Sequence, residues 1–411
     1  MPFSSLGLSP ALLRAVNARS YTNPTAIQSA AIPAVLQGRD VLGSAQTGSG
    51  KTAAFALPLL QQLAQAPQDR PRRVHTLVLV PTRELAAQVG DEFRSLAQHL
   101  ADPVKVTVVF GGVSINPQMM GLRGGTDIVV ATPGRLLDLI DHNALSLGNV
   151  STLVLDEADR LLDLGFAEEL ARILALLPTQ RQNLFFSATF PPEVQTLAQT
   201  LLREPVHIDV LPEAQNEPDI AQRAIAVDTG KRTQLLRHLI TQHGWSRVLV
   251  FVATKHAAEI VADKLRKAGI DAEPFHGELS QGKRTQVLTD FKASRISVMV
   301  ATDVAARGID IAQLPVVVNY DLPRSTADYT HRIGRTGRAG ESGLAVSFVS
   351  AATEAHFRLI EKRQGLKLAR EQLAGFEPVD IAPIDAAGTG GVKGKRPSKK
   401  DKLRAAAARK P

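Results

Sequence analysis

Short apolar runs recur along this chain, and each ends in a small or polar residue followed by a turn or the start of a helix. A short apolar run bounded in this way is typical of a buried strand in a parallel sheet. The first half contains such runs at residues 40–43, 76–80, 127–130, 152–155 and 184–186, and the second half at 248–252, 297–300 and 316–318. Helical patterns such as 83–97 and 256–268 lie between them. This alternation predicts an α/β protein whose parallel sheets are flanked by helices.

The length of the chain and its repeated construction predict two domains. At 411 residues it is longer than one hydrophobic core usually supports, and both halves alternate strands and helices in the same way. The polar stretch 211–218 (LPEAQNEP) is the best candidate for a connection. We expect a first domain over residues 1–208, a linker over 209–222, a second domain over 223–375, and a disordered basic tail over 376–411.

Composition narrows the class of protein. An apolar content of 44% and a charged content of 21% are ordinary for a soluble globular protein. No apolar stretch approaches the roughly eighteen residues of a membrane span, and the N-terminus has no basic region followed by an apolar core. The absence of cysteine excludes disulfides and thiolate metal sites, and the ten histidines are scattered. We therefore expect a cytoplasmic protein without a membrane segment or a structural metal.

The net charge of +8 is concentrated at one end of the chain. Residues 392–411 contain nine Lys and Arg against one acidic residue, Asp401, and the remaining 39 basic and 39 acidic residues balance over positions 1–391. Such a tail would add salt-sensitive affinity for a polyanion by releasing counterions. A disordered extension that only keeps the protein soluble is the alternative.

Residues 45–52 (AQTGSGKT) follow the strand predicted at 40–43 and precede a helix that starts at Ala53. This is the layout of a P-loop, or Walker A motif, with Ala in place of the usual first Gly. Lys51 would reach the β- and γ-phosphates, and the Thr52 hydroxyl would ligate Mg²⁺. A Gly-rich turn that binds no nucleotide is the alternative. The backbone N–H groups that would hold the phosphates belong to Thr47, Gly48, Ser49 and Gly50.

Three carboxylates in four residues, Asp156, Glu157 and Asp159, follow the strand predicted at 152–155. Ligands gather at the carboxyl ends of strands in open parallel sheets, and these carboxylates repel one another unless a cation lies among them. Hydrated Mg²⁺ on a nucleotide suits that position, although an acidic helix N-terminus would give the same pattern. Together with the P-loop, the cluster assigns Asp156 to Mg²⁺ and Glu157 to the attacking water.

Residues 331–338 (HRIGRTGR) place three arginines in the second half. If this segment is helical, Arg332, Arg335 and Arg338 lie along one face, an arrangement that like charges and two glycines oppose unless a polyanion faces it. Solvated surface arginines are the alternative. An arginine brought to a γ-phosphate from another domain accelerates hydrolysis by roughly 10³–10⁵. We therefore expect hydrolysis to require closure of the two domains.

These motifs, in this order, resemble those of the DEAD-box ATP-dependent RNA helicases over about residues 1–375. The short chain, the segment 276–282 (HGELSQG) and the brief basic tail are most similar to the bacterial RhlE type. The resemblance implies two tandem RecA-like domains, each a parallel sheet flanked by helices. It also implies an ATP-hydrolysing enzyme that uses ATP and Mg²⁺.

The resemblance assigns further residues to the nucleotide. Phe3 matches an isolated aromatic residue that stacks on adenine, and Gln28 matches the glutamine that reads the edge of adenine. Ala26 stands where the family usually has Pro. The positions that match the ribose contact and the arginine fingers of the second domain are Gly308, Asp310, Arg335 and Arg338.

A further matching motif, residues 187–189 (SAT), links the nucleotide to RNA in this family. The resemblance implies that Ser187 and Thr189 do so through hydrogen bonds with Asp159 and His331. If that match holds, these residues carry the ATP state to the RNA-binding surface.

The resemblance also gives the RNA contacts, which are Arg83, Gly111, Gly112, Thr132 and Arg135 in the first domain and Thr254, Gly277 and Thr302 in the second. Aromatic residues make up only 4% of the chain, and none of these loops carries an exposed side chain that could stack on a base. Glycine, Thr and Arg suit contacts to phosphate and 2′-OH groups, which implies little sequence preference. Taken singly, each loop could equally be an ordinary helix cap or turn.

Our leading hypothesis is an RNA-stimulated ATPase that unwinds short RNA duplexes locally and non-processively, and remodels RNA–protein complexes, by closing the cleft between its domains. An ATP-gated RNA clamp or RNA chaperone would use the same motifs. A processive DNA translocase is a third class, against which the implied 2′-OH contacts argue. We expect a monomer that binds structured or duplex RNA, with protein partners drawn from ribosome assembly or RNA decay.

Overall fold

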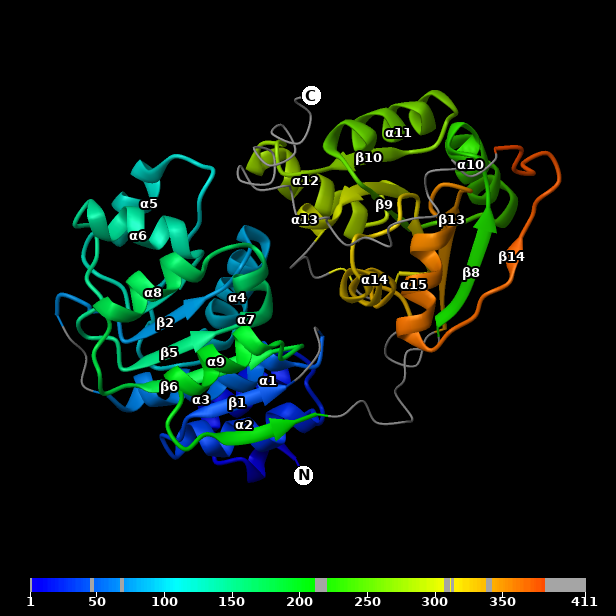
Figure 1. The fold of residues 1–411 in the computed structure, drawn as a ribbon. Helices are drawn as coiled ribbons and strands as arrows, with labels where there is room; N and C mark the ends of the chain where they lie inside the picture. The colour runs from blue at the N-terminus through cyan, green and yellow to red at the C-terminus, as the bar shows by residue number, and fades with distance from the viewer. Residues whose placement is uncertain are drawn as a thin grey trace, which may run out of the picture. The chain divides into compact units, whose positions relative to one another are not determined.

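The computed structural model describes residues 2–44, 48–66, 70–210, 220–306, 311, 314–337 and 342–380. They form two compact units, the first made of the described residues up to 210 and the second of those from 220 onward. Figure 1 shows that each unit is a sheet with helices on its faces. No helix in these described ranges is long and apolar enough to cross a membrane.

The first unit contains a seven-stranded sheet in the order β3-β4-β2-β5-β6-β1-β7, and all of its strand pairs are parallel. Its strands are β1 Val41–Ser44, β2 Thr76–Leu79, β3 Val106–Val109, β4 Ile128–Ala131, β5 Thr152–Leu155, β6 Gln182–Ser187 and β7 Val206–Asp209. Its helices are η1 Phe3–Ser5, α1 Pro10–Ala18, α2 Ala26–Leu36, α3 Lys51–Gln65, α4 Arg83–Ala97, α5 Ile115–Leu122, α6 Pro133–Asp141, α7 Ala158–Asp163, α8 Ala167–Leu176 and α9 Pro192–Leu201.

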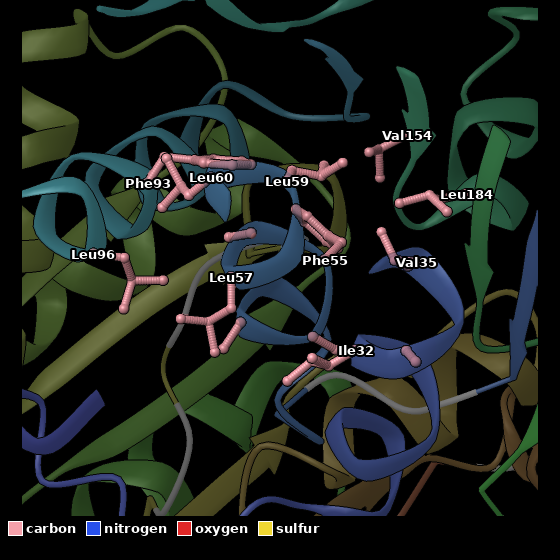
Figure 2. Packing of buried hydrophobic residues seen from close by; sticks show 14 of the residues in the cluster. Ile32, Val35, Phe55, Leu57, Leu59, Leu60, Phe93, Leu96, Val154 and Leu184 are labelled. Atoms are coloured by element: carbon pink, nitrogen blue, oxygen red, sulfur yellow. The ribbon is translucent and has the colours of Figure 1, made fainter. Parts of the chain in front are cut away.

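Two apolar clusters cover the two faces of this sheet, because successive residues of a strand point to opposite faces. In β5, Val154 packs in one cluster, whereas Leu153 and Leu155 pack in the other. Figure 2 shows the first of these clusters, in which the side chains of α2, α3 and α4 meet β5 and β6. Its aromatic centre is Phe55, whose ring centroid lies 6.0 Å from that of Phe93. Each such side chain contributes about 1.5–3 kcal/mol when it is fully buried.

The second unit repeats this plan with seven parallel strands in the order β10-β11-β9-β12-β13-β8-β14. Its strands are β8 Ile220–Ala226, β9 Val248–Val252, β10 Ala272–Phe275, β11 Val298–Thr302, β12 Val316–Asn319, β13 Gly343–Val349 and β14 Arg370–Glu371. Its helices are η2 Thr229–Lys231, α10 Arg232–His243, α11 Lys255–Lys267, α12 Gln281–Lys292, α13 Asp303–Ala306, α14 Thr326–Ile333 and α15 Glu354–Gln364.

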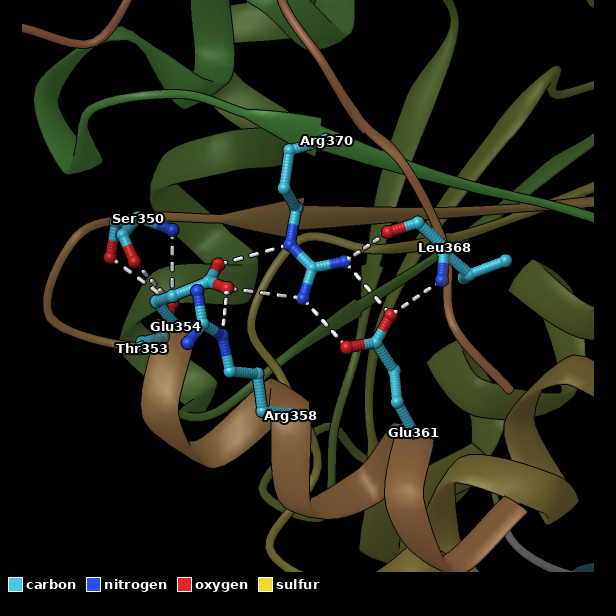
Figure 3. Close-up of polar contacts among 7 residues, drawn as sticks. All are labelled: Ser350, Thr353, Glu354, Arg358, Glu361, Leu368 and Arg370. Carbon is cyan, nitrogen blue, oxygen red and sulfur yellow. Dashed lines mark hydrogen bonds and ion pairs between the residues drawn. The ribbon is translucent and has the colours of Figure 1, made fainter. Parts of the chain in front are cut away.

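The short edge strand β14 is fastened to α15 by charged side chains. Figure 3 shows the Arg370 guanidinium between two carboxylates, 3.0 Å from Glu354 and 2.7 Å from Glu361. It also donates to the Leu368 carbonyl at 2.9 Å and lies 4.8 Å from the centroid of the Phe357 ring. This network holds the last strand on the sheet.

The predicted fold class is confirmed, since both sheets are parallel and flanked by helices. The predicted linker 209–222 was too long at both ends, because Asp209 closes β7 and residues 220–222 open β8. The predicted tail also began too early. Phe376 packs against the core of the second unit, and the Asp228 carboxylate accepts hydrogen bonds from the backbone N–H groups of Val379 and Asp380. Residues 211–219 and 381–411 lie outside the described ranges.

Candidate functional site

The strand order of the first unit sorts the candidate residues into two neighbouring groups. Because every strand pair is parallel, all carboxyl ends lie at one edge of the sheet. The loops after the adjacent strands β3, β4 and β2 carry Gly111, Gly112, Thr132 and Arg83. The loops after the adjacent strands β5, β6 and β1 carry Asp156, Glu157, Asp159, Ser187, Thr189 and the described part of the P-loop. The residues expected to bind RNA and those expected to bind ATP thus occupy opposite halves of one edge.

The described part of the P-loop has the backbone of a phosphate-binding turn. Gly48 and Gly50 have positive φ angles of 85° and 91°, a region that favours glycine. A Cβ atom on Gly50 would lie 2.5 Å from the Gln28 side-chain nitrogen. The Ser49 hydroxyl oxygen is buried without a hydrogen-bond partner among the described residues. A buried polar atom of this kind normally has a partner, and a bound phosphate group would provide one.

The acidic cluster meets the P-loop at Asp156. Lys51 opens α3, and its Nζ lies 4.0 Å from Asp156 Oδ1, with both side chains buried. Burial raises the pKa of Asp156 to about 6, although the Lys51 ammonium group lowers it and the Glu157 carboxylate raises it further. Burial therefore disfavours the charged form of the Asp156 carboxylate. Added positive charge near this carboxylate would restore it.

Glu157 is held in an uncommon backbone conformation beside Asp156. Its φ angle is 52°, in the left-handed region that a residue with a side chain rarely adopts. Its backbone N–H donates to Asp156 Oδ1 at 3.0 Å, and its carboxylate lies 3.4 Å from the Arg160 guanidinium. Such strain persists where the surroundings fix it, and it is common at functional sites. The carboxylate is therefore aimed by the backbone and by its pairing with Arg160.

Asp159 joins the acidic cluster to the loop after β6. Its Oδ2 accepts hydrogen bonds from the Thr189 backbone N–H at 3.0 Å and from the Thr189 hydroxyl at 2.7 Å. Its own backbone N–H donates to the Ser187 hydroxyl at 3.2 Å, and that hydroxyl donates to the Thr189 carbonyl at 2.7 Å. The structure thus brings three of the four expected coupling residues together. The fourth, His331, belongs to α14 in the second unit.

A cavity of about 690 Å³ extends from Asp156 and the P-loop to the turn that follows α1. Thr52, Gln28 and Tyr21 are among the residues that line it. Gln28 joins the start of α2 to the P-loop, because its amide oxygen accepts from the Thr25 N–H at 3.0 Å and its amide nitrogen donates to the Gly50 carbonyl at 3.1 Å. The cavity therefore reaches beyond the P-loop.

The structure contradicts the prediction that Phe3 stacks on adenine. Phe3 is only 4% exposed, belongs to the apolar core, and is not among the residues that line the cavity. The aromatic residue that does line the cavity is Tyr21, which is half-buried and lies seven positions before Gln28. Both aromatic residues precede Gln28, and spacing alone could not show which one is buried in the core.

The expected RNA contacts of the first unit differ in how open they are. Gly111 is free of crowding, since a Cβ atom there would meet nothing within 4 Å. The Arg83 guanidinium packs directly over Gly112, which has a φ angle of 76°. Thr132 is buried at the start of α6. Arg135 is also buried, and it donates to the Val113 carbonyl at 2.7 Å. This hydrogen bond joins Arg135 to the loop that contains Gly111 and Gly112, and its RNA contact stays a prediction.

The second unit places its expected RNA contacts in the same way, after the three adjacent strands β10, β11 and β9. Gly277 is exposed, and a Cβ atom there would meet nothing within 4 Å. Thr302 is half-buried at the end of β11. Thr254 is exposed, and its hydroxyl caps α11 by accepting from the Ala257 N–H at 3.1 Å. These positions form one group at the carboxyl edge of the sheet.

Arg332 and Arg335 do not share a helical face, because α14 ends at Ile333. Arg332 is buried and forms a bidentate pair with Asp303, with N–O distances of 2.6 and 2.7 Å. It also donates to the Asp321 carbonyl at 2.6 Å. Arg332 therefore joins the start of α13 to α14 and is not free for a polyanion. Arg335 lies beyond the helix and is buried as well.

Several predicted residues lie outside the described ranges, namely Thr47, Gly308, Asp310 and Arg338. Within the described ranges, no group of three or more His, Asp or Glu side chains could hold a metal ion by itself. A cation at Thr52 and Asp156 would therefore need further oxygen ligands, such as those of phosphate groups and water.

Comparison with known proteins gives matches over both units. Residues 25–197 match the family described as DEAD/DEAH box helicase, and residues 230–340 match the helicase conserved C-terminal domain. The chain is 42% identical over 368 residues to the DEAD-box ATP-dependent RNA helicase CshA of Bacillus cereus, covering 90% of this chain and 69% of that protein. It is 41% identical over 385 residues to the ATP-dependent RNA helicase DeaD of Mycobacterium tuberculosis, covering 93% of this chain and 67% of that protein.

Solved structures agree with these matches. The structure of S. cerevisiae Dbp5 bound to RNA and ADP BeF3 aligns with a TM-score of 0.79 and 31% identity, covering 90% of this chain and 95% of that one. The structure of Mss116p bound to ssRNA and AMP-PNP also aligns with a TM-score of 0.79, at 27% identity, covering 90% of this chain and 79% of that one. The similarity to the RhlE type stays a prediction.

Proposed function

The chain belongs to the DEAD-box family of ATP-dependent RNA helicases, and from this membership we propose that RNA-stimulated ATP hydrolysis drives local, non-processive unwinding of short RNA duplexes and remodelling of RNA–protein complexes. The observation that carries the proposal is the strand order of the first unit. It sets the loops expected to bind ATP directly beside the loops expected to bind RNA. The Asp159–Thr189 hydrogen bonds lie within the ATP half, two residues beyond Glu157.

The nucleotide phosphates would bind to the P-loop. The buried Ser49 hydroxyl without a partner and the left-handed glycines fit a phosphate group. Lys51 would neutralise the β- and γ-phosphates, as its burial beside Asp156 suggests. Thr52 and Asp156 would hold Mg²⁺, which supplies positive charge to the phosphates and offsets the cost of the buried Asp156 charge.

Glu157 would orient the attacking water and accept its proton. Its left-handed backbone and its ion pair with Arg160 fix the carboxylate before the nucleotide binds, and such preorganisation favours catalysis. His331, Arg335 and Arg338 of the second unit would complete the site when ATP and RNA are both bound. Hydrolysis would then reopen the two units and release the RNA.

The adenine base would stack on Tyr21 at the far end of the cavity. Gln28 would read the edge of the base, because an amide has two N–H donors and two oxygen lone pairs. The structure uses one donor on Gly50 and one lone pair on Thr25. One of each remains for adenine, which would favour ATP over GTP.

RNA would bind across the carboxyl edges of the two sheets with little sequence preference. The open surroundings of Gly111 and Gly277 support this proposal, since the protein's own packing does not require glycine at either position. A closely approaching RNA backbone would require glycine there, because a side chain would block the approach. Arg83 at the start of α4 would contact a phosphate. We infer a monomeric cytoplasmic protein, with protein partners of ribosome assembly or RNA decay.

The decisive experiment compares ATP hydrolysis stimulated by RNA and by DNA of equal sequence. We expect stimulation by RNA alone, together with displacement of a short RNA strand that does not extend to long duplexes. Equal stimulation by DNA with unwinding of long duplexes would instead indicate a processive DNA translocase. RNA-stimulated hydrolysis without strand displacement would indicate the alternative function, an ATP-gated RNA clamp or chaperone.

The variant Glu157→Gln isolates the proposed hydrolytic role. The amide keeps the shape of the side chain but cannot accept the proton of water, so we expect turnover to fall by roughly 10²–10⁴. ATP-dependent RNA binding should persist, because the contacts to nucleotide and RNA are unchanged. Normal turnover in this variant would remove Glu157 from the mechanism.

A further inference from the structure

Three side chains form a hydrogen-bonded clamp at the far end of the cavity. The Tyr21 hydroxyl donates to Glu92 Oε1 at 2.9 Å, and Arg19 Nη2 donates to Glu92 Oε2 at 2.6 Å. The Arg19 guanidinium also lies over the Tyr21 ring, 5.9 Å from its centroid. All three residues line the cavity. Both oxygens of Glu92 are thus used to hold the two side chains together.

The clamp joins a turn to a rigid helix. Arg19 and Tyr21 lie in the turn after α1, where Ser20 has a φ angle of 56° that residues with a side chain rarely adopt. Glu92 lies in the third turn of α4, and α1 packs on α4. Its side chain is only 11% exposed, whereas that of Arg19 is 43% exposed. A turn with little regular structure therefore takes its side-chain geometry from α4.

The chemistry of the clamp keeps Tyr21 in one orientation. Burial raises the pKa of Tyr21, and the Glu92 carboxylate raises it further, so the phenol stays protonated and remains a donor. The hydrogen bond at the tip of the side chain and the guanidinium over one face hold the ring in place. Tyr21 is half-buried against the apolar cluster of the first unit and also lines the cavity. An aromatic ring at the cavity wall suits a planar group, and a purine base is the planar group of the proposed substrate.

We propose that Glu92 is a positioning residue for ATP, which fixes the Tyr21 ring as the platform for the base while Arg19 holds the carboxylate in place. This inference rests on the proposed function, because it takes ATP as the occupant of the cavity. The clamp acts on the base and not on the phosphates. Its loss should therefore weaken binding without slowing the chemical step.

The test compares Glu92→Ala, Glu92→Gln and Tyr21→Phe in RNA-stimulated ATP hydrolysis by the full chain, together with equilibrium binding of ATP. We expect Glu92→Ala to raise KM and Kd for ATP about ten-fold with kcat within about two-fold, since it removes a charge-assisted hydrogen bond. Glu92→Gln keeps an acceptor for Tyr21 and should have a smaller effect. In the double variant, the increase in Kd for ATP should be smaller than the product of the increases in the two single variants.

Binding of inorganic tripolyphosphate distinguishes a role at the base from a general structural role of Glu92. It lacks a base, so its affinity for Glu92→Ala should equal its affinity for the original protein. The matched control is Glu371→Ala, which breaks an Arg–Glu pair with an N–O distance of 2.6 Å in the second unit. That control should lower stability and leave KM for ATP unchanged.

The outcomes separate the inference from the proposed function. If the original protein hydrolyses ATP with RNA and Glu92→Ala binds ATP normally, the positioning role is wrong. Equal weakening of ATP and tripolyphosphate would also overturn it, because the defect would then be general. If Glu92→Ala does not fold, Glu92→Gln and Tyr21→Phe decide by the same criteria. If the original protein shows no RNA-stimulated hydrolysis, the proposed function fails instead.

Discussion

Asp156 shows how the burial of a single carboxylate can lower the stability of the protein. Its pKa rises from 3.8 to about 6 on folding, because burial outweighs the attraction of Lys51. Since the folded pKa is the higher one, protonation stabilises the folded state fully below about pH 4, and this stabilisation is lost as the pH rises through 6. At neutral pH the negative charge on Asp156 therefore lowers the free energy of unfolding by about 1–3 kcal/mol.

The variant Asp156→Asn should therefore stabilise the ligand-free protein while it abolishes hydrolysis. We expect the Tm of the first unit to rise by roughly 2–8 °C at pH 7.5 and the gain to vanish below about pH 4. Thermal unfolding in the presence of a chelator, measured from pH 4 to pH 8, checks this. A lower Tm at pH 7.5 would mean that the Lys51–Asp156 attraction outweighs the cost of burial.

Residue roles could be predicted from the sequence only where a motif itself specifies the geometry. The P-loop and the acidic cluster did so, and the structure places Lys51 and Asp156 side by side. Phe3 was misassigned, because its burial depends on packing partners far away in the sequence. The Arg19–Glu92 pair joins positions 73 residues apart, and no local pattern indicates it.

At the scale of elements, the apolar runs named above predicted strands correctly, whereas the polar residues of β8 obscured that strand. Residues 248–252 were predicted and form β9, whereas β8 contains Gln222 and Arg223 and was partly assigned to the linker. Its polar side chains have partners within the second unit, because Arg223 pairs with Glu371 of β14 and Gln222 accepts from the Tyr329 hydroxyl. Tertiary contacts thus allow strand residues that a local pattern excludes.

The Arg370 network predicts how firmly β14 is held. Arg370→Ala leaves Glu361, whose side chain is only 9% exposed, without its arginine. We expect the second unit to lose about 1–3 kcal/mol of stability, discounted because Arg370 is itself partly exposed. Hydrogen exchange should increase at residues 366–371.

The control for this prediction is Arg358→Ala on the same helix. Arg358 pairs with Glu354 across one turn and is 74% exposed, so its loss should cost no more than about 0.5 kcal/mol. Equal effects of the two variants would mean that the network does not fasten the strand.

At the scale of the whole molecule, the excess of positive charge lies in residues 392–411, beyond the described ranges. Deleting these residues removes nine basic side chains. If they contact RNA, the slope of log affinity against log salt should become less negative by several units, at about 0.7 per phosphate contact. Measuring the RNA affinity at salt concentrations from about 50 to about 300 mM checks this.

Replacing the same nine residues by Gln controls for the length of the tail. It should flatten the salt dependence as the deletion does. An unchanged slope in both variants would leave the tail with a solubilising role only.

The placement of β1 between β6 and β7 has a consequence for how the protein is made. Val41 pairs with Leu184 on one side and Val206 on the other, so the strand that leads into the P-loop finds its neighbours only after the rest of the first unit has been translated. Such distant pairings form slowly, and unpaired strand edges are prone to aggregation. A nascent chain on the ribosome would therefore carry its P-loop sequence through most of the synthesis of the first unit without a formed nucleotide site.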